Sequence, residues 1–307
     1  MARFLISRLL QAVAVLWVVA TLTFVLMHLV PGGPFDRERR LPPEVLANIA
    51  AKYRLDDPLP VQYLRYLKDL LGGNLGLSYR YVDRTVNAIV ADTLPVSARL
   101  GLYALLFTLL FSFPVALVAA SRPNTWSDRL ALFLATLGVS LPSFVLGAFL
   151  MWFFSLKLGW VDSGGWGQVS SMILPIVTLA AAPAAYLSYL LRSTLIESLG
   201  EDFVRTARAK GLGEAAVLFK HALRNSLIPV LTVLGPLAAA LVTGSFVVEY
   251  VFAVPGMGRF YITAVTDRDY PMIMGVTMVY TALVVGANLL VDLFYTLVDP
   301  RIKIRGE

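Results

Sequence analysis

The sequence predicts an all-α protein that crosses a membrane six times. Of its 307 residues, 58% are hydrophobic and 15% are charged, whereas soluble domains carry about 25% charged residues. Six apolar stretches are long enough to cross a bilayer core of about 30 Å, which takes roughly 20 helical residues. They cover residues 9–30, 100–120, 130–156, 172–191, 227–248 and 272–298. The absence of cysteine and the presence of only two histidines exclude thiolate and multi-histidine metal sites.

The first stretch follows Arg3 and Arg8, as the apolar part of a secretory signal peptide would. It is longer than that part usually is, and no small-x-small cleavage site precedes Pro31, so we expect an uncleaved span. Basic residues near span ends concentrate on the cytoplasmic side. With the N-terminus inside, the inner segments hold thirteen Lys and Arg and the two short outer loops hold three. We therefore expect both termini in the cytoplasm, and the net charge of +6 then reflects topology rather than binding to nucleic acid.

Residues 31–98 are expected to form a small helical insertion on the outer face. Pro42-Pro43 opens one helical pattern, which continues to Tyr53. Asp57-Pro58 opens a second pattern, which ends at Gly72-Gly73, and Asp83 is placed to cap a third short helix that carries Val86 and Ile89. Two interpretations stay open for this insertion: a structural collar, or a docking surface for a partner outside the membrane.

Residues 192–226 form the longest predicted cytoplasmic segment. The acids Glu201 and Asp202 open a helical pattern, the bases Arg208 and Lys210 close it, and Gly211 follows, which matches the helix dipole and a glycine stop. A second pattern covers residues 214–224.

The first of these helices is amphipathic, because Phe203, Val204 and Ala207 share one face. A helix this short is not stable alone, so we expect it to need a surface. That surface is either anionic lipid or a groove in a cytoplasmic protein.

Two strings in this segment resemble the cytoplasmic loop of importer permeases of the ATP-binding-cassette (ABC) class. Residues 205–212 read Arg-Thr-Ala-Arg-Ala-Lys-Gly-Leu, and residues 221–225 read His-Ala-Leu-Arg-Asn. The general motif of that class is degenerate here, since only Ala207, Gly211 and Leu223 agree with it. The departures are themselves similar to the oligopeptide/dipeptide subfamily.

The resemblance to this subfamily extends over nearly the whole chain. It includes residues 31–34, Pro-Gly-Gly-Pro, and residues 73–78, Gly-Asn-Leu-Gly-Leu-Ser. It also includes residues 249–258, Glu-Tyr-Val-Phe-Ala-Val-Pro-Gly-Met-Gly, and the end of the chain with Asp299-Pro-Arg301. The long loop between spans one and two resembles the B-type permease of such systems.

The resemblance implies a type I ABC importer permease fold, with residues 1–30 as the first span, 31–98 as the outer loop and 99–307 as the permease core. It also implies a bacterial inner-membrane peptide importer in which this chain forms half of the pathway and binds lipid around its spans. A second, C-type permease, two cytoplasmic ATPases that bind ATP and Mg, and an extracytoplasmic binding protein would complete it. The residues that couple to the ATPases would be Phe203, Arg205, Thr206, Ala207, Arg208, Lys210, Gly211 and Leu212.

Several residues within or beside the spans are candidates for the pathway or for its support. Glu249 falls at the outer end of span five, just before the turn that holds Pro255, Gly256 and Gly258. We expect these four at the outer gate. Asp292 falls near the inner interface, where a charge is tolerated, and we expect it to be structural. Small residues at four-residue intervals in span five, from Gly235 to Thr243, predict a close helix contact, either internal or with the partner permease.

Other functions fit the sequence less well. A channel or secondary carrier needs charged or broken-helix sites near the midplane, and the predicted span centres contain no Asp, Glu, Lys or Arg. An intramembrane enzyme would need a metal-binding or nucleophile motif, and neither His-Glu-x-x-His nor Gly-x-Ser-x-Gly occurs. No catalytic residue is therefore predicted, and no cofactor is expected in this chain. Within the family, the substrate stays open between peptides, glutathione and nickel chelates.

Overall fold

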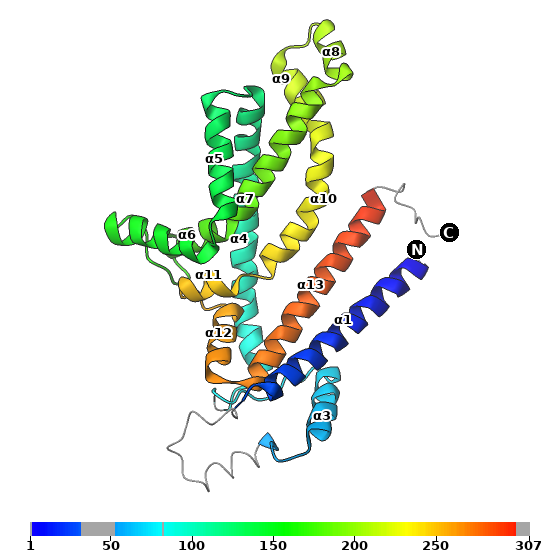
Figure 1. Ribbon diagram of the computed structural model, residues 1–307, viewed down its shortest axis with the longest axis vertical. Helices are drawn as coiled ribbons and strands as arrows, with labels where there is room; N and C mark the ends of the chain where they lie inside the picture. The colour runs from blue at the N-terminus through cyan, green and yellow to red at the C-terminus, as the bar shows by residue number, and fades with distance from the viewer. Residues whose placement is uncertain (1, 32–52, 82, 299–307) are drawn as a thin grey trace. The chain divides into compact units, whose positions relative to one another are not determined.

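The computed structural model describes residues 2–31, 53–81 and 83–298, and the regular structure of these residues is helical (Figure 1). The chain divides into two compact units, residues 1–95 with 256–290 and residues 96–255 with 291–307. The predicted helix that ends at Tyr53 lies almost wholly outside the described residues. The helices are, in order, α1 Ala2–Leu29, α3 Leu59–Leu71, α4 Val86–Ser121, α5 Trp126–Ser140, α6 Ser143–Leu150, the π-helix η2 Met151–Lys157, α7 Val169–Gly200, α8 Asp202–Ala209, α9 Glu214–Ala216, the π-helix η3 Val217–Ala222, α10 Leu223–Val242, α11 Phe246–Val251, α12 Met257–Asp267 and α13 Tyr270–Val298.

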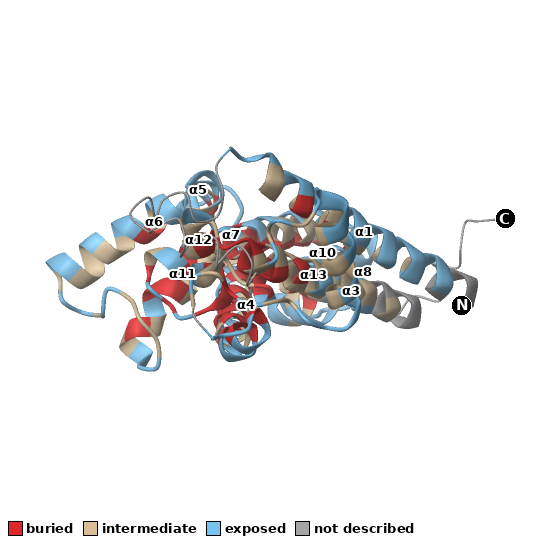
Figure 2. Ribbon diagram, turned by 90° about the horizontal axis from the view of Figure 1, so that it is seen from below, coloured by how far each residue is buried: buried red, intermediate tan, exposed pale blue. Residues whose placement is uncertain are grey.

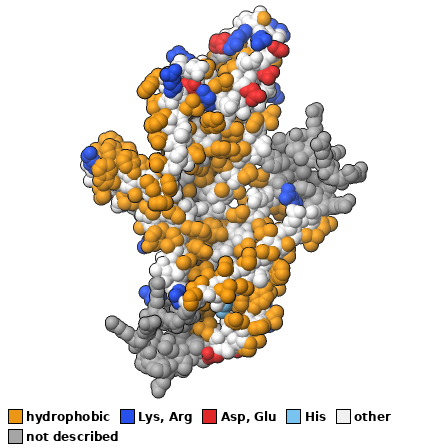
Figure 3. Space-filling model, viewed as in Figure 1, with side chains coloured by type: hydrophobic (Ala, Val, Ile, Leu, Met, Phe, Trp, Pro, Cys, Tyr) orange, Lys and Arg blue, Asp and Glu red, His pale blue; other side chains and the backbone are white. Residues whose placement is uncertain are grey.

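The predicted spans are confirmed as long apolar helices. Among the residues that the structure describes, five helical stretches are long and apolar enough to cross a membrane, and one sharply bent pair raises the number to six. The same helices carry large apolar side chains on their outer surfaces, Leu10, Val13 and Leu110 among them. Figure 3 shows how much of the visible surface is hydrophobic. Exposure of such a large apolar surface to water is unfavourable, so these faces are suited to contact with lipid.

The predicted span at residues 130–156 is not one straight helix. It consists of α5 and α6–η2, which meet at an angle of 112°. The break falls at Leu141-Pro142, where both residues adopt extended ψ angles of 126° and 137°. Proline disfavours the helical conformation of the residue before it and lacks an N–H to donate. The prolines inside α7 and α10, by contrast, leave their helices continuous.

Two other predicted elements belong to longer helices. The expected short helix with Val86 and Ile89 is the start of the 36-residue helix α4, and its cap is Thr85 rather than Asp83, since Thr85 Oγ1 accepts the N–H of Ala88 at 3.1 Å. The pattern at residues 214–224 is likewise the start of the long apolar stretch that runs from Glu214 to Val251. Local signals predicted helical structure at both places, but they did not show that each short pattern is the start of a longer helix.

Glycines allow two close helix approaches in the unit formed by residues 96–255 and 291–307. A Cβ atom added to Gly101 of α4 would lie 2.0 Å from the carbonyl oxygen of Leu241 in α10. A Cβ atom added to Gly235 of α10 would lie 2.6 Å from the side chain of Val291 in α13. The close contact predicted for Gly235 is therefore internal to this chain. Figure 2 shows buried residues concentrated on α4 and α7, whereas α1 is largely exposed.

Helix α3 follows the predicted boundaries and lies against α1 in the other unit. Pro58 precedes its first turn and Gly72 is its C-cap, and Gly73 after it has a left-handed φ of +73° that glycine adopts without a steric penalty. The hydroxyls of Thr21 in α1 and Tyr63 in α3 are 2.7 Å apart. The ring of Phe24 lies 5.3 Å from that of Tyr63. The described part of the predicted outer insertion thus contains helix α3, which contacts the first span, and the start of α4.

Candidate functional site

Helix α8 lies at the end of α7 in the segment predicted to be cytoplasmic (Figure 1). The residues that limit it are those predicted: Glu201 is the N-cap and Lys210 the C-cap. Gly211 has a φ of +80°, a left-handed conformation that glycine adopts without a steric penalty. Its N–H donates to the carbonyl of Arg208 at 2.9 Å. The glycine therefore ends the helix and turns the chain towards α9.

The chain itself covers two of the three residues on the predicted apolar face of α8. Val204 and Ala207 are buried and form a cluster with Val217 of η3, against which Leu199 of α7 also packs. Phe203, the third residue, stays exposed, so the chain supplies part of the surface that this short helix was expected to need. Ala207 is placed to fix the packing of α8 rather than to contact a partner directly.

The remaining coupling candidates form the outward surface of α8 and of the turn after it. Phe203 is 37% exposed and Leu212 is 40% exposed. The polar members Arg205, Thr206 and Lys210 are exposed as well. Figure 3 shows Lys, Arg, Asp and Glu side chains gathered at the end of the molecule that carries this helix. The surface thus combines two apolar side chains with a mixed-charge rim, a composition that suits a protein interface.

Phe219 is an exposed residue in the same segment that the sequence did not single out. It lies on η3 and is more than half exposed. The sequence signal for this residue is that it is aromatic and does not share the helix face of Val217 and Ala222, which are buried. Exposed aromatic residues of this kind are enriched in protein interfaces.

Arg208 holds the turn after α8 closed. Its Nε and Nη2 donate to the two carboxylate oxygens of Glu214 at 2.9 and 3.0 Å. The hydrogen bond to Glu214 raises the pKa of Arg208 above its usual value, so the guanidinium stays charged. A two-point contact fixes orientation as well as distance. The pair therefore ties α8 to the start of the next helix.

Three hydroxyls join α7 to the helix that returns from α8. Ser226 Oγ donates to the carbonyl of Thr194 at 3.0 Å, and Thr194 Oγ1 donates to the carbonyl of Ser226 at 3.2 Å. Ser198 Oγ donates to the carbonyl of Ala222 at 3.3 Å. Leu191, Leu195 and Val230 form an apolar cluster at the same level. Side-chain hydrogen bonds therefore join the two helical segments on either side of α8 directly.

Asp128 and Arg192 form a buried ion pair between α5 and α7. Arg192 donates from Nε and Nη2 to both carboxylate oxygens, the second contact at 2.7 Å. Asp128 Oδ2 also accepts the N–H of Asn124 at 2.8 Å. The sequence analysis did not single out this pair, because its members are 64 positions apart.

The outer-gate candidates are placed differently from the coupling surface. Glu249 lies in α11 and is completely buried rather than exposed at an open mouth. Ser245 caps this helix by accepting the N–H of Val248 at 3.3 Å. Phe252 of the same turn packs with Leu174 near the start of α7. About 40 Å of helix, at 1.5 Å per residue, separates Leu174 from α8, so the structure does not bring the two groups together.

The other residues of this group lie around the start of α12. Pro255 is exposed, and Gly256 and Gly258 are buried, with Gly256 as the N-cap of α12. Asp292 lies in α13, but its side chain falls outside the described residues, as does the segment from Asp299 to the C-terminus.

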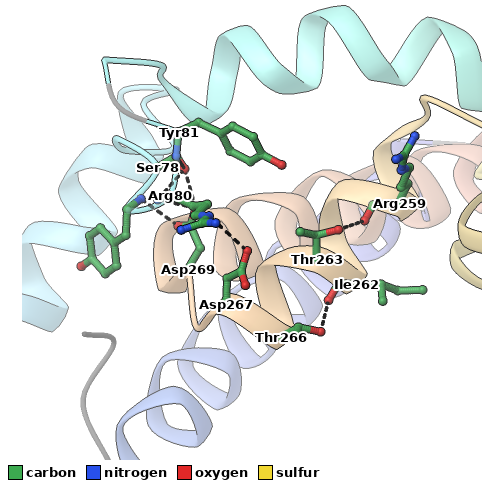
Figure 4. Close-up of polar contacts among 10 residues, drawn as sticks. Ser78, Arg80, Tyr81, Arg259, Ile262, Thr263, Thr266, Asp267 and Asp269 are labelled. Atoms are coloured by element: carbon green, nitrogen blue, oxygen red, sulfur yellow. Dashed lines mark hydrogen bonds and ion pairs between the residues drawn. The ribbon is translucent and has the colours of Figure 1, made fainter. Parts of the chain in front are cut away.

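Asp269 is a buried acid that the sequence analysis missed (Figure 4). Its carboxylate accepts hydrogen bonds from the hydroxyl of Ser78 and from the N–H groups of Tyr79 and Arg80, the latter two at 3.1 and 3.3 Å. The pKa of Tyr79 is raised, mainly because its phenol is buried and in addition because the negative charge of Asp269 lies nearby. The available signal was an Asp directly before the last span, followed by Tyr270-Pro271, which is a helix-start pattern.

Comparisons with known proteins extend these observations. The family described as binding-protein-dependent transport system inner membrane component matches residues 112–304, and the N-terminal part of that membrane component matches residues 1–101. The oligopeptide transport system permease protein OppB of Haemophilus influenzae is 41% identical over 305 residues, which cover 99% of this chain and 100% of that protein. The dipeptide transport system permease protein DppB of Bacillus subtilis is 42% identical over 307 residues and the full length of both chains.

A solved structure shares the fold. It is the crystal structure of an amino acid ABC transporter with histidines, at a TM-score of 0.55 and 17% identity over 68% of this chain and 93% of that chain. At this identity the likeness concerns the fold, and it agrees with the predicted type I permease architecture. Together with the full-length relatives, these matches show that the chain belongs to the binding-protein-dependent transport permeases, in their oligopeptide/dipeptide branch of ABC importer membrane subunits.

Proposed function

We propose that this chain is the B-type permease subunit of an ATP-driven peptide importer in a bacterial inner membrane. It forms half of the pathway with a second, C-type permease, and both of its termini lie in the cytoplasm. An extracytoplasmic binding protein delivers the peptide to the outer face. A peptide substrate is supported by relatives that are named for oligopeptide and dipeptide transport and that align with this chain over its full length. Glutathione and nickel chelates remain alternatives within the same family.

The energy for transport comes from separate ATPase chains. The sequence contains no Gly-x-x-x-x-Gly-Lys-Ser/Thr loop to hold nucleotide phosphates. ATP and Mg are therefore bound by the partner subunits, and this chain contributes no catalytic residue. Its role is to move between two packings whose populations the ATPases shift.

One observation carries the proposal: α8 is fixed to two membrane helices and exposes a surface of its own. Val204 and Ala207 anchor the helix inward, and the paired hydroxyls of Thr194 and Ser226 join α7 to α10 directly below it. Phe203 and Leu212 remain outside for a partner. Force applied to α8 is thus transmitted to α7 and α10, which is the arrangement that a coupling helix needs.

Site-directed crosslinking tests this assignment, because the chain contains no cysteine of its own. Thr206→Cys places a thiol on the exposed face of α8, and Ser121→Cys places one on an exposed residue at the end of α4, on the same predicted side. In the assembled transporter we expect Thr206→Cys to crosslink to an ATPase subunit in a nucleotide-dependent way. Ser121→Cys is the matched control for proximity to the membrane surface.

Two outcomes would contradict the proposal. Equal crosslinking from both positions, or none from Thr206→Cys in a complex that hydrolyses ATP, would remove α8 from the coupling role. Ion transport by the purified chain alone in liposomes would replace the importer with a channel or secondary carrier. Uptake of labelled peptides by the complete system, compared with glutathione and nickel chelates, identifies the substrate class.

A further inference from the structure

Two neighbouring cavities lie where α1 meets α3, within one compact unit. Their volumes are about 420 and 400 Å³, and both are lined by Phe24 and His28. The smaller cavity is walled by apolar parts of both helices, with Val25 and Leu29 on α1 and Leu59 on α3. The larger cavity is walled by aromatic and polar side chains. A single amphiphilic molecule could therefore occupy both.

The apolar cavity is lined by the last turns of a helix that is long and apolar enough to cross a membrane. The candidate span of α1 ends at Leu29, and the α1 residues that line the cavity, Thr21 to Leu29, cover about 12 Å at 1.5 Å per residue. That length corresponds to most of one leaflet of a hydrocarbon core of about 30 Å. Val25, Leu29 and Leu59 are also exposed on the outside of the fold. The groove therefore opens to the lipid that surrounds α1.

The polar cavity is lined by hydrogen-bond donors, among them Tyr66 and Arg54, and by one carboxylate, that of Asp69. The phenol oxygen of Tyr66 is buried and has no partner among the described residues, and burial raises the pKa of this phenol to about 12, so it stays protonated. Arg54 is exposed and makes no ion pair with any residue that the structure describes. By contrast, Arg65 in the same cavity is already paired with Asp57. A phosphate group supplies the acceptors and the charge that Tyr66 and Arg54 fit.

We propose that these two cavities bind one phospholipid of the leaflet at the C-terminal end of α1, with an acyl chain in the groove between α1 and α3 and the phosphate near Arg54 and Tyr66. On the orientation proposed above, this is the outer leaflet, and the lipid fixes α3 against the first span. A phospholipid fits better than a peptide because the apolar half opens sideways to the bilayer rather than to water. The binding itself does not depend on the transported substrate.

A photoreactive phosphatidylglycerol with a diazirine in its acyl chain tests the proposal on the full-length chain in nanodiscs, with labelled residues mapped by mass spectrometry. Val25→Trp fills the apolar cavity. Val18→Trp is its matched control, since Val18 lies two turns earlier on the same face of α1 and is 44% exposed against 43% for Val25. We expect labelling of α1 and α3 near the cavity in the unaltered chain and in Val18→Trp, and its loss in Val25→Trp.

Arg54→Gln tests the headgroup half of the site. Loss of one charge-assisted hydrogen bond is expected to weaken lipid retention about tenfold, and Tyr66→Phe should weaken it further without emptying the groove. Equal labelling of Val25→Trp and Val18→Trp, or unchanged retention in the combined Arg54→Gln and Tyr66→Phe variant, would overturn the proposal. Mapping of a photoreactive peptide to these residues would also overturn it and reassign the cavity to substrate. None of these readouts requires transport, so they can fail or succeed independently of the importer assignment.

Discussion

The carboxylate of Asp269 accepts a hydrogen bond from the hydroxyl of Ser78, although the two residues lie 191 positions apart in the chain. The same carboxylate accepts the N–H of Met272 at 3.2 Å and so caps the start of α13. It also accepts the N–H groups of Tyr79 and Arg80. One buried acid therefore fixes both the last span and the turn that follows residues 73–78.

We expect Asp269→Ala to destabilise this region by about 2–4 kcal/mol, because it removes a cap and leaves buried donors without an acceptor. The thermal midpoint in detergent and limited proteolysis of residues 73–85 would measure the change. Asp267→Ala is the control, since Asp267 forms an ion pair with Arg80 at 3.5 Å that is accessible to solvent. Ion pairs of this kind contribute about 0–1 kcal/mol. Similar effects of the two substitutions would show that Asp269 has no special role.

The Arg208–Glu214 pair is expected to act on coupling more than on stability. Because both groups are exposed, Arg208→Glu and Glu214→Arg should each change the thermal midpoint little. Each should lower peptide-stimulated ATP hydrolysis in the assembled transporter, since the turn after α8 is no longer held. The double reversal should restore it. Restoration by the double reversal separates loss of the pair from loss of a charge that a partner contacts, and coupling that stays low in the double variant would contradict this account.

The sequence predicted the local features of the fold well. The start and stop of α8 followed from Glu201, Lys210 and Gly211 because helix caps depend on neighbouring residues alone. The same holds for α3 between Pro58 and Gly72. Apolar length predicted the spans, since a bilayer sets that length independently of tertiary packing.

Features that depend on distant contacts could not be predicted in the same way. The pairing of Asp128 with Arg192 and of Asp269 with Ser78 joins residues that no local pattern relates. The burial of Val204 and Ala207 against Val217 supplies part of the surface that α8 was expected to find on another molecule. The predicted span at residues 130–156 contains Pro142, but whether a proline kinks or breaks a helix depends on what its neighbours pack against, and here the bend reaches 112°.

The buried pair of Asp128 and Arg192 yields a third prediction. Asp128→Asn removes one charge and leaves a guanidinium of low exposure without its counter-ion, which is expected to cost about 3–5 kcal/mol. Replacing both residues, as in Asp128→Leu with Arg192→Leu, should cost less than the single substitution because no uncompensated charge remains. Thermal midpoints of the unaltered chain and of the two variants in detergent would measure this order, and a double variant less stable than Asp128→Asn would contradict it.

The contact of Gly101 with α10 yields the fourth prediction, which concerns the packing of the spans. A methyl group at this position would overlap the backbone of Leu241 and Val242 at 2.0 to 2.7 Å, and backbone atoms cannot rotate away as a side chain can. Gly101→Ala is therefore expected to separate α4 from α10 and to destabilise the protein by about 3 kcal/mol or more. Gly286→Ala in α13 is the matched control, because a Cβ atom there meets nothing within 4 Å and alanine favours the helix by about 1 kcal/mol. Both substitutions add one methyl group to an apolar helix. A lower thermal midpoint for Gly101→Ala together with an unchanged or higher one for Gly286→Ala would isolate the effect of close packing. Parallel shifts would show that α4 and α10 are not held at this distance in the membrane.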